Sequence, residues 1–478
     1  MAALYGCMAV QAAATATPAL EDIVRQQAEE IRLLRARLDA LEARSAPVAQ
    51  ASSAPPATIV IPPRSASVAV DPFPNIVMPG PADLSLAQAK AANPAGLTTD
   101  WNSGAPLLRS ADGRFTFKPR GRILIDASST MGSRYTDRNM TTTGGRALRM
   151  GMEGGAGPHL FYQFEVDYAN NGVDLVTAFV GWRNRIAGTA LEYDIRVGHL
   201  FNDRSFEGGT RSDMTPFLDR NTVATSIIPQ RAFYGVGIQP RLFGPNWHMS
   251  FTLTGDRVDG TQAASDSRTI IVRGHWNPLK TNRSLIHLGA WAFDEHLSGT
   301  AGLLTRNAAI GGRFNDALRI STGTLTGGTG DTGYGLELGG YAGPLWLMGE
   351  WGQREARTRQ GETFDTRAMS LSGGWFLTGE LPPYNPRTGN LAQPKVRHSI
   401  LDGGTGAIEL VARYEQLSFD GLPTGGSGWA ATLGSNWYLT NLVRLMVNVI
   451  HWETDNRSGA FTGKDDGQTA TARVSVSF

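Results

Sequence analysis

Several features are scarce in this 478-residue chain, and each scarcity excludes a class of protein. No run of 18 or more uncharged apolar residues occurs, which excludes a membrane protein built from spanning helices. Cys7 is the only cysteine, so the chain cannot form an internal disulfide. The formal net charge of +1 argues against a nucleic-acid binder, which needs a basic excess to meet phosphate. Lysine is limited to five positions, so arginine must supply any cationic site: Lys90, Lys118, Lys280, Lys395 and Lys464.

The first 44 residues divide into two segments. Residues 1–16 are apolar and rich in alanine, and Ala14-Thr15-Ala16 has the small-x-small pattern of a cleavage site, which we interpret as the remnant of a signal peptide. Residues 17–44 carry a heptad pattern, which predicts a coiled coil because a single helix of this length is marginal in water. The alternative is an isolated amphipathic helix. The apolar seam consists of Leu20, Val24, Ile31, Leu34, Leu38 and Leu41.

Residues 45–112 are rich in proline, alanine and serine over most of their length, as in Pro55-Pro56 and Pro62-Pro63. Such a composition cannot build a core and predicts an extended linker. A short helix over residues 82–92 is an alternative for part of this segment.

From residue 113 to the end, polar and apolar side chains alternate in one segment after another. The last of these, Ala472 to Phe478, ends on an aromatic residue. This pattern is typical of an all-β transmembrane barrel, whose strands show one face to lipid and the other to a wet lumen. An even number of strands is also required of a single-chain bacterial barrel. We expect sixteen antiparallel strands near residues 115–128, 145–154, 160–168, 175–183, 190–200, 232–240, 246–256, 268–277, 285–297, 333–342, 345–355, 366–377, 407–420, 428–438, 442–453 and 468–478.

The connections support this reading because short and long ones alternate. Short turns are expected at one end of the barrel, and long loops over 129–144, 201–231, 298–332 and 454–467 at the other. The connection 378–406 is long where a short one is expected. Residues 313–324 could form one more strand.

Several stretches, in order along residues 113–478, resemble the phosphate-selective porin family, the O and P porins. They include Phe117 to Asp126, Arg146 to Gly154, Arg196 to Phe201, Phe217 to Arg220 and Gly406 to Tyr414. The resemblance implies a homotrimer of sixteen-stranded barrels in the outer membrane of a Gram-negative cell, surrounded by lipid and lipopolysaccharide. It also implies an arginine-lined aqueous pore that is selective for inorganic anions such as phosphate. Family members with an amino-terminal coiled coil occur, so the coiled coil and linker are expected in the periplasm.

Five arginines are the candidate anion-binding and pore-lining residues. Arg122 and Arg146 alternate with Ile123, Ile125 and Leu148, so we expect both to point into the lumen. Arg211, Arg220 and Arg231 lie in the 201–231 segment, which porins commonly fold inward. The alternative is that these loop arginines are solvated and pair with Asp213 and Asp219 at the surface. The family typically has adjacent arginines where this chain has Arg146-Ala147, which weakens a strict phosphate assignment.

The sequence therefore predicts a passive, anion-preferring diffusion channel of the phosphate or polyphosphate type. The alternatives are a general diffusion porin without anion preference, and a tether between the outer membrane and peptidoglycan through the coiled coil. No enzyme, cofactor or metal site is expected, because the scattered histidines form no recognisable motif. His275-Trp276 and His451-Trp452 are expected in an interfacial aromatic belt.

Overall fold

The computed structural model describes residues 98–101, 104–169, 172–229, 233–258, 267–297 and 303–478. The expected signal peptide, coiled coil and most of the linker therefore lie outside the described residues. No helix among the described residues is long and apolar enough to cross a membrane.

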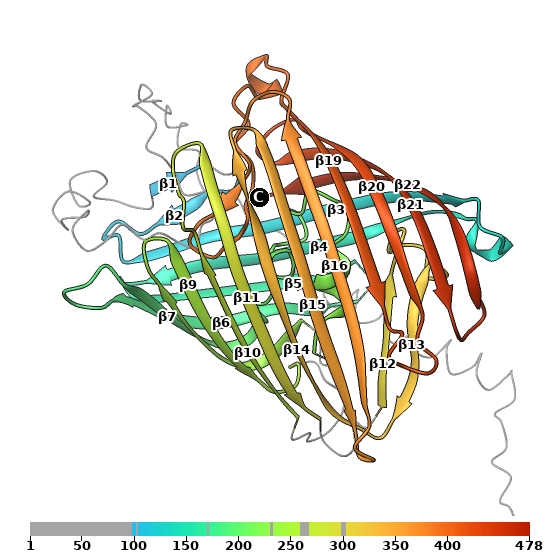
Figure 1. Cartoon of the computed structure of the whole chain (residues 1–478). Coiled ribbons are helices and arrows are strands. Elements are labelled where there is room, and N and C mark those ends of the chain that lie inside the picture. The colour runs from blue at the N-terminus through green and yellow to red at the C-terminus, as the bar shows by residue number, and fades with distance from the viewer. Residues whose placement is uncertain (1–97, 102–103, 170–171, 230–232, 259–266, 298–302) are drawn as a thin grey trace, which may run out of the picture. The chain divides into compact units, whose positions relative to one another are not determined.

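Sixteen antiparallel strands close into a barrel, as the sequence predicted (Figure 1). Strand β22 pairs with β3, for example Ser477 with Arg122, and this pairing closes the ring. The wall strands are β3 (Phe115–Met131), β4 (Thr141–Ala156), β5 (Leu160–Asp167), β6 (Asp174–Arg185), β7 (Glu192–Phe201), β8 (Tyr234–Phe243), β9 (Trp247–Thr254), β10 (Arg268–Trp276), β11 (Ser284–His296), β14 (Gly328–Ala342), β15 (Leu345–Thr358), β16 (Thr363–Phe376), β19 (Ala407–Ser418), β20 (Ser427–Tyr438), β21 (Val443–Asn456) and β22 (Gly463–Ser477).

The barrel is apolar outside and polar inside. On β3, Ile123 and Ile125 are exposed on the outer face, whereas the flanking Arg122 and Asp126 are buried on the inner face. Leu336 and Leu338 of β14 are likewise exposed, and Glu337 between them is buried. A soluble barrel would bury its apolar face, so this inverted arrangement is that of a barrel surrounded by lipid.

Several boundaries differ from the expected ones. The connections expected over 129–144 and 454–467 are shorter than expected, spanning 132–140 and 457–462, because β3, β4, β21 and β22 continue beyond the range that alternation alone indicated. The segment assigned to the linker contains a short hairpin, β1 (Thr98–Asp100) and β2 (Leu107–Arg109), and Leu108 pairs with Phe117 of β3. Residues 313–324 add no strand to the wall: β13 (Arg319–Thr326) pairs only with β12 (Leu303–Ala309).

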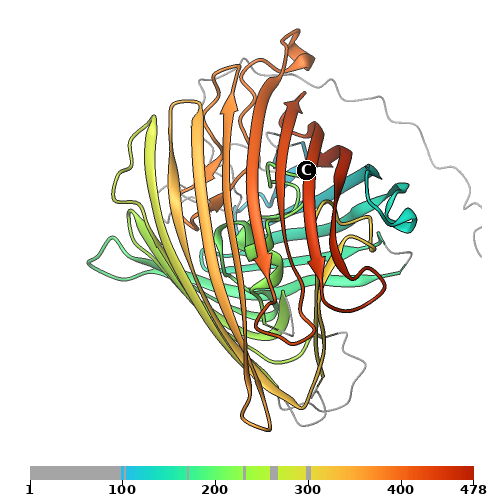
Figure 2. The same ribbon diagram turned by 45° about the vertical axis from the view of Figure 1, so that its right-hand side comes forward.

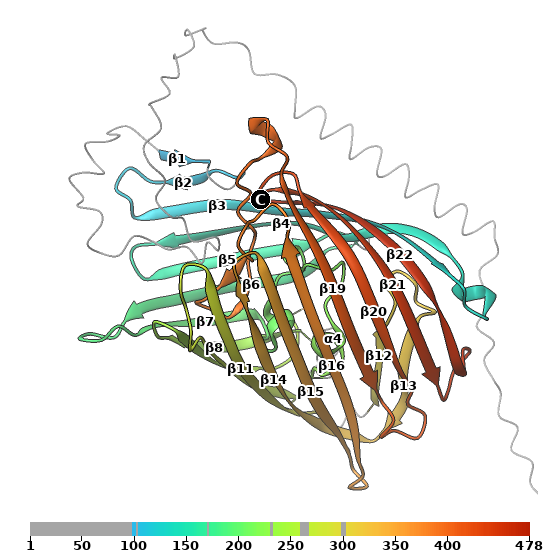
Figure 3. The ribbon, with the colours of Figure 1, turned by 45° about the horizontal axis from the view of Figure 1, so that its top comes forward.

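Three connections fold into the lumen. The 202–233 loop carries the short helices α3 (Phe206–Gly209) and α4 (Thr222–Ser226), and the green segment containing them lies inside the ring of strands (Figures 2 and 3). The 297–327 loop contains the β12–β13 hairpin, whose Ile310 and Ile320 pack with Ile450 and Trp452 of β21. The 377–406 connection contains β17 (Tyr384–Asn385), β18 (Asn390–Leu391) and the 3-10 helix η3 (Ile400–Asp402). A second 3-10 helix, η1 (Thr136–Arg138), follows β3.

The three segments enter from different ends of the barrel. The 202–233 and 297–327 loops follow β7 and β11, which run away from the end at which Phe478 lies. The 377–406 connection follows β16, which runs back toward that end, here called the terminal end. The lumen is therefore narrowed from both sides.

Candidate functional site

Arg122 fastens the 202–233 loop to the barrel wall. Its guanidinium lies 3.2 Å from Glu165 of β5 and 3.2 Å from Asp213 of the loop, and it donates a hydrogen bond to Ser212 at 3.2 Å. The side chain is 4% exposed. Arg122 does point into the lumen, but two carboxylates neutralise its charge, so its main contribution is to position the loop.

Other wall residues hold the main chain of the same loop. Arg444 of β21 donates to the carbonyl oxygens of Asp213 and Thr215 at 2.8 and 2.9 Å. Arg413 of β19 donates to the carbonyl oxygen of Asp219 at 2.9 Å and pairs with Glu207. Short loop segments leave many carbonyl groups without regular partners, and these guanidinium groups satisfy them.

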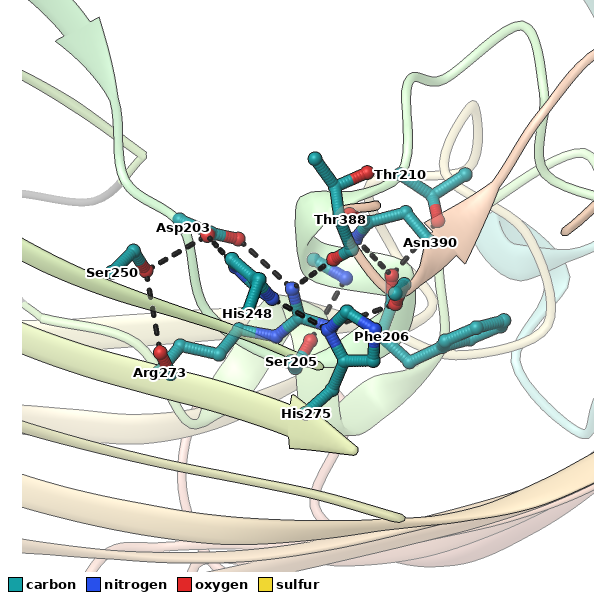
Figure 4. A network of polar contacts seen from close by, with 12 residues as sticks. Asp203, Ser205, Phe206, Thr210, His248, Ser250, Arg273, His275, Thr388 and Asn390 are labelled. Carbon is teal, nitrogen blue, oxygen red and sulfur yellow. Dashed lines mark hydrogen bonds and ion pairs between the residues drawn. The ribbon is translucent and has the colours of Figure 1, made fainter. Parts of the chain in front are cut away.

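A buried polar network joins the 202–233 loop to the 377–406 connection. Arg273 of β10 pairs with Glu337 at 2.8 Å and with Asp203 at 3.1 Å, and donates to the carbonyl oxygens of Thr388 and Gly389 at 2.9 and 2.8 Å. Figure 4 shows the Arg273 side chain between Asp203 and Thr388. One fully buried arginine thus holds both inward segments against the wall.

Three histidines from neighbouring strands extend this network. His248 contacts Asp203 at 3.1 Å, and its ring approaches that of His275 (Figure 4). His275 contacts the carbonyl oxygen of Pro386 at 3.1 Å, and His287 lies between Glu337 and Tyr384, 2.9 and 2.7 Å away. All three are buried, so they serve to connect the two inward segments with the wall.

Among the described residues, two cavities beside these segments are rich in arginine. The cavity nearer the terminal end measures about 190 Å³ and the other, the distal cavity, about 240 Å³. Arginines outnumber carboxylates seven to three in the first and five to three in the second. The first is lined by Arg120, Arg122, Arg149, Arg196, Arg211, Arg220 and Arg241, with Glu153, Glu165 and Asp203. The second is lined by Arg146, Arg220, Arg313, Arg319 and Arg413, with Asp126, Asp219 and Glu415.

Arg220 lines both cavities and so lies between them. Its Nε donates to the carbonyl oxygens of Glu207 and Thr210 at 3.0 and 3.2 Å, and its guanidinium lies over the rings of Phe201 and Phe233. These contacts keep one arginine fixed in the lining of both cavities. Arg220 is therefore both a loop anchor and a lining residue.

A β-bulge directs Arg146 into the lumen. Leu124 and Ile125 pair with Ala147 and Gly145, which leaves Arg146 as the extra residue of β4. Arg146 has the same parity as Leu148 and the exposed Met150, so regular alternation would have turned it toward lipid. A bulge changes the direction of a side chain in this way. Arg146 therefore lines the distal cavity because of the bulge, and not because of regular alternation.

The charged state of the loop residues follows from their surroundings. Burial raises the pKa of Asp213, but Arg122 and Arg211 lower it by more, so the net pKa lies well below its ordinary value. Asp203 has a similarly lowered pKa, because Arg273 and His248 outweigh the effect of burial. Burial lowers the pKa of Arg220 to about 10, which still leaves it charged at neutral pH.

The remaining expected residues divide as follows. Arg211 forms a two-pronged ion pair with Asp213, at 3.1 and 2.7 Å, and lines the cavity nearer the terminal end. Arg231 lies outside the described residues. Arg313, Arg273 and the histidine cluster were not anticipated, because their neighbours are distant in sequence. In the sequence, these residues are indicated only by the recurrence of arginine and histidine at the polar positions of segments with alternating polar and apolar residues.

A closed sixteen-stranded antiparallel barrel with an apolar exterior and an occluded polar lumen defines the porin class of outer-membrane proteins. Residues 117–478 match the family model described as phosphate-selective porin O and P, and the chain belongs to that family. The predicted family is therefore confirmed.

Two kinds of relative were found. An uncharacterized protein of Caulobacter vibrioides is 29% identical over 443 residues, which cover 86% of this chain and 82% of that protein. Among solved structures, the anion-selective porin from Comamonas acidovorans is 13% identical with a TM-score of 0.47, covering 76% of this chain and 100% of that one. OmpT of Vibrio cholerae is 11% identical with a TM-score of 0.47, covering 78% of this chain and 100% of that one.

Proposed function

We propose that this protein is a passive, anion-preferring diffusion channel that works as a homotrimer, with the terminal end of each barrel facing the periplasm. The observation that supports this proposal is the excess of arginine over carboxylate in two cavities that share Arg220 in their linings. Family membership supports a channel rather than an enzyme.

Fixed guanidinium groups suit such a channel for two reasons. Their charge persists at every physiological pH, and a narrow passage with walls of low dielectric constant focuses their field on the passing ion. The neighbouring carboxylates hold the arginines in place and reduce the net charge. An anion is therefore attracted at several points in series but is not trapped at any of them.

The test is the reversal potential of the purified protein in a planar bilayer under a gradient of potassium chloride at low salt, where screening is weakest. We expect the unmodified channel to favour chloride, and Arg146→Gln and Arg313→Gln each to reduce the anion-to-cation permeability ratio by roughly two-fold or more. Arg367→Gln is the matched control, because it removes the same charge from an exposed position of β16 that lines neither cavity.

The outcome of this experiment separates the two porin hypotheses. A reversal potential near zero in the unmodified protein would assign it to the general diffusion porins. An equal effect of Arg146→Gln and Arg367→Gln would show that overall charge, rather than the cavity arginines, sets the preference.

A further inference from the structure

The distal cavity combines cationic and apolar groups in its lining. Arg146, Arg220 and Arg313 supply guanidinium groups, and six larger apolar side chains line the same cavity among polar ones. We propose that this cavity selects organic acids, in which a carboxylate is attached to an apolar, preferably aromatic, body, over small inorganic anions. The proposal rests on the anion-preferring function above and specifies the solute. The apolar lining includes Phe217, Leu218, Phe233, Ile310, Phe314 and Ile450.

Within the described part of the chain, two guanidinium groups of the cavity have free hydrogen-bond donors. Asp219 lies 3.9 Å from Nε of Arg146 and accepts a hydrogen bond at 3.3 Å from the main-chain nitrogen of Arg313. Among the described residues, neither the Arg146 nor the Arg313 guanidinium donates a hydrogen bond to a protein atom, unlike those of Arg122 and Arg413. A carboxylate entering the cavity can therefore be met by planar, two-pronged donors.

Phe314, one of these apolar residues, lies directly beside the donors. The ring of Phe314 rests against Gly144 of β4, two residues from Arg146: a Cβ atom at Gly144 would lie 2.9 Å from that ring. Phe314 also lies 5.6 Å from the guanidinium of Arg313. A solute whose carboxylate reaches Arg146 thus places its apolar part against Phe314.

Inorganic anions cannot use this surface. A chloride or phosphate ion would leave the phenyl and aliphatic groups in contact with water, whereas an aromatic acid would cover them. A tenfold preference requires only about 55 Å² of apolar contact at about 25 cal/mol per Å². The cavity volume of about 240 Å³ is below the range of about 300–1,000 Å³ that is typical for drug-sized ligands, so the proposal is confined to small, single-ring acids.

The experiment measures how organic acids block the chloride current of the full-length trimer in a planar bilayer. Acetate, butyrate, benzoate and inorganic phosphate are added at neutral pH, and the half-blocking concentration of each is determined. We expect that of benzoate to be at least about tenfold lower than those of acetate and phosphate, with butyrate between them. Because this series uses the unmodified protein, its result does not depend on how any variant folds.

A pair of variants locates the site. Phe314→Ser should raise the half-blocking concentration of benzoate about tenfold and leave that of acetate and the reversal potential in potassium chloride unchanged. Phe461→Ser is the control, because Phe461 is an aromatic residue of another loop that lines neither cavity. Equal effects of the two variants would contradict the proposed location.

The two proposals fail in different ways. If chloride is preferred over potassium but benzoate and acetate block equally, the selection of organic acids is wrong and the anion channel remains. If the unmodified channel shows no anion preference at all, the proposed function itself is wrong. Phosphate blocking at lower concentration than benzoate would also overturn the selection of organic acids.

Discussion

Replacing Arg122 by alanine should loosen the 202–233 loop rather than simply remove a charge from the pore. The substitution deletes the ion pairs with Glu165 and Asp213 and the hydrogen bond to Ser212. Both carboxylates are almost fully buried, so each then depends on its remaining partners. The sequence alone indicated a pore-lining residue that points into the lumen.

The free-energy cost of Arg122→Ala depends on the partners that Asp213 and Glu165 keep. Breaking a buried ion pair typically costs 3–5 kcal/mol. Asp213 keeps Arg211 at 2.7 Å and Glu165 keeps Arg149 at 3.1 Å, so we take the lower limit of about 3 kcal/mol. This corresponds to roughly a hundredfold increase in the population of the undocked loop.

A thiol placed in the loop can measure that population. Met214 is 6% exposed and directly follows Asp213, so a cysteine there reacts only when the loop undocks. In a Cys7→Ser background, Met214→Cys carries the only thiol of the chain. The reagent should be a small, uncharged methanethiosulfonate, because a charged one would respond to the altered potential as well as to access.

We expect Arg122→Ala to accelerate labelling of Met214→Cys roughly a hundredfold, and Arg146→Ala to change it by less than about threefold, because the Arg146 contact with Asp219 is long at 3.9 Å. The reasoning would be refuted if Arg122→Ala left the labelling rate unchanged while shifting the reversal potential as much as Arg146→Ala does. In that case Arg122 would act as a lining charge only.

Three further predictions concern the network, the loop and the barrel seam. Arg273→Met should lower barrel stability by about 3–5 kcal/mol, because Glu337 and Asp203 lose their shared cation. The loss is measured as a lower temperature of the heat-induced gel shift. Arg367→Met, at an exposed position, should leave that temperature unchanged. Between pH 7 and about 4.5 the chloride conductance should show no step from Asp213. Because the pKa of Asp213 is lowered in the folded protein, its stabilisation of the docked loop is present above the unfolded pKa of about 3.9 and is lost only as the pH falls through the lower folded pKa. A conductance step near pH 5 that Asp213→Asn abolishes would contradict this prediction. Phe478→Ala should reduce the amount of assembled protein in the outer membrane. The stability of the folded barrel should be nearly unchanged, because the two 3.0 Å main-chain hydrogen bonds between residues 478 and 121 remain. Normal amounts of assembled protein at native expression would show that the terminal ring is dispensable.

The sequence by itself determined the wall of this protein. Alternation with a period of two is a local property, because a strand that separates lipid from a wet lumen needs apolar and polar residues in turn. Each of the sixteen expected segments therefore overlaps a wall strand, although several strands, such as β4, β14 and β22, extend further than expected. The motifs that resemble the O and P porins likewise lie in the part of the chain that matches the family.

The tertiary structure alone decided which polar residues act together inside the wall. Arg146 faces the lumen only because the pairing of β3 with β4 contains a bulge, and the sequence of neither strand alone determines how the two strands pair. Trp452, expected in the interfacial belt, is instead fully buried and packs with Ile310 of the β12–β13 hairpin. Trp276 is exposed on the outer face, as a belt residue should be.

The partners of the lumen arginines depend on folding over long distances. Arg122 and Asp213, or Arg273 and Gly389, are separated by about ninety or more residues and meet only after the barrel has closed and the inward segments have docked. Composition can show that arginine is abundant, but only these contacts distinguish an anchor such as Arg122 from a donor such as Arg146 that remains available to a passing anion. The charge of each residue is local, whereas its compensation by a distant carboxylate or carbonyl is a property of the whole fold.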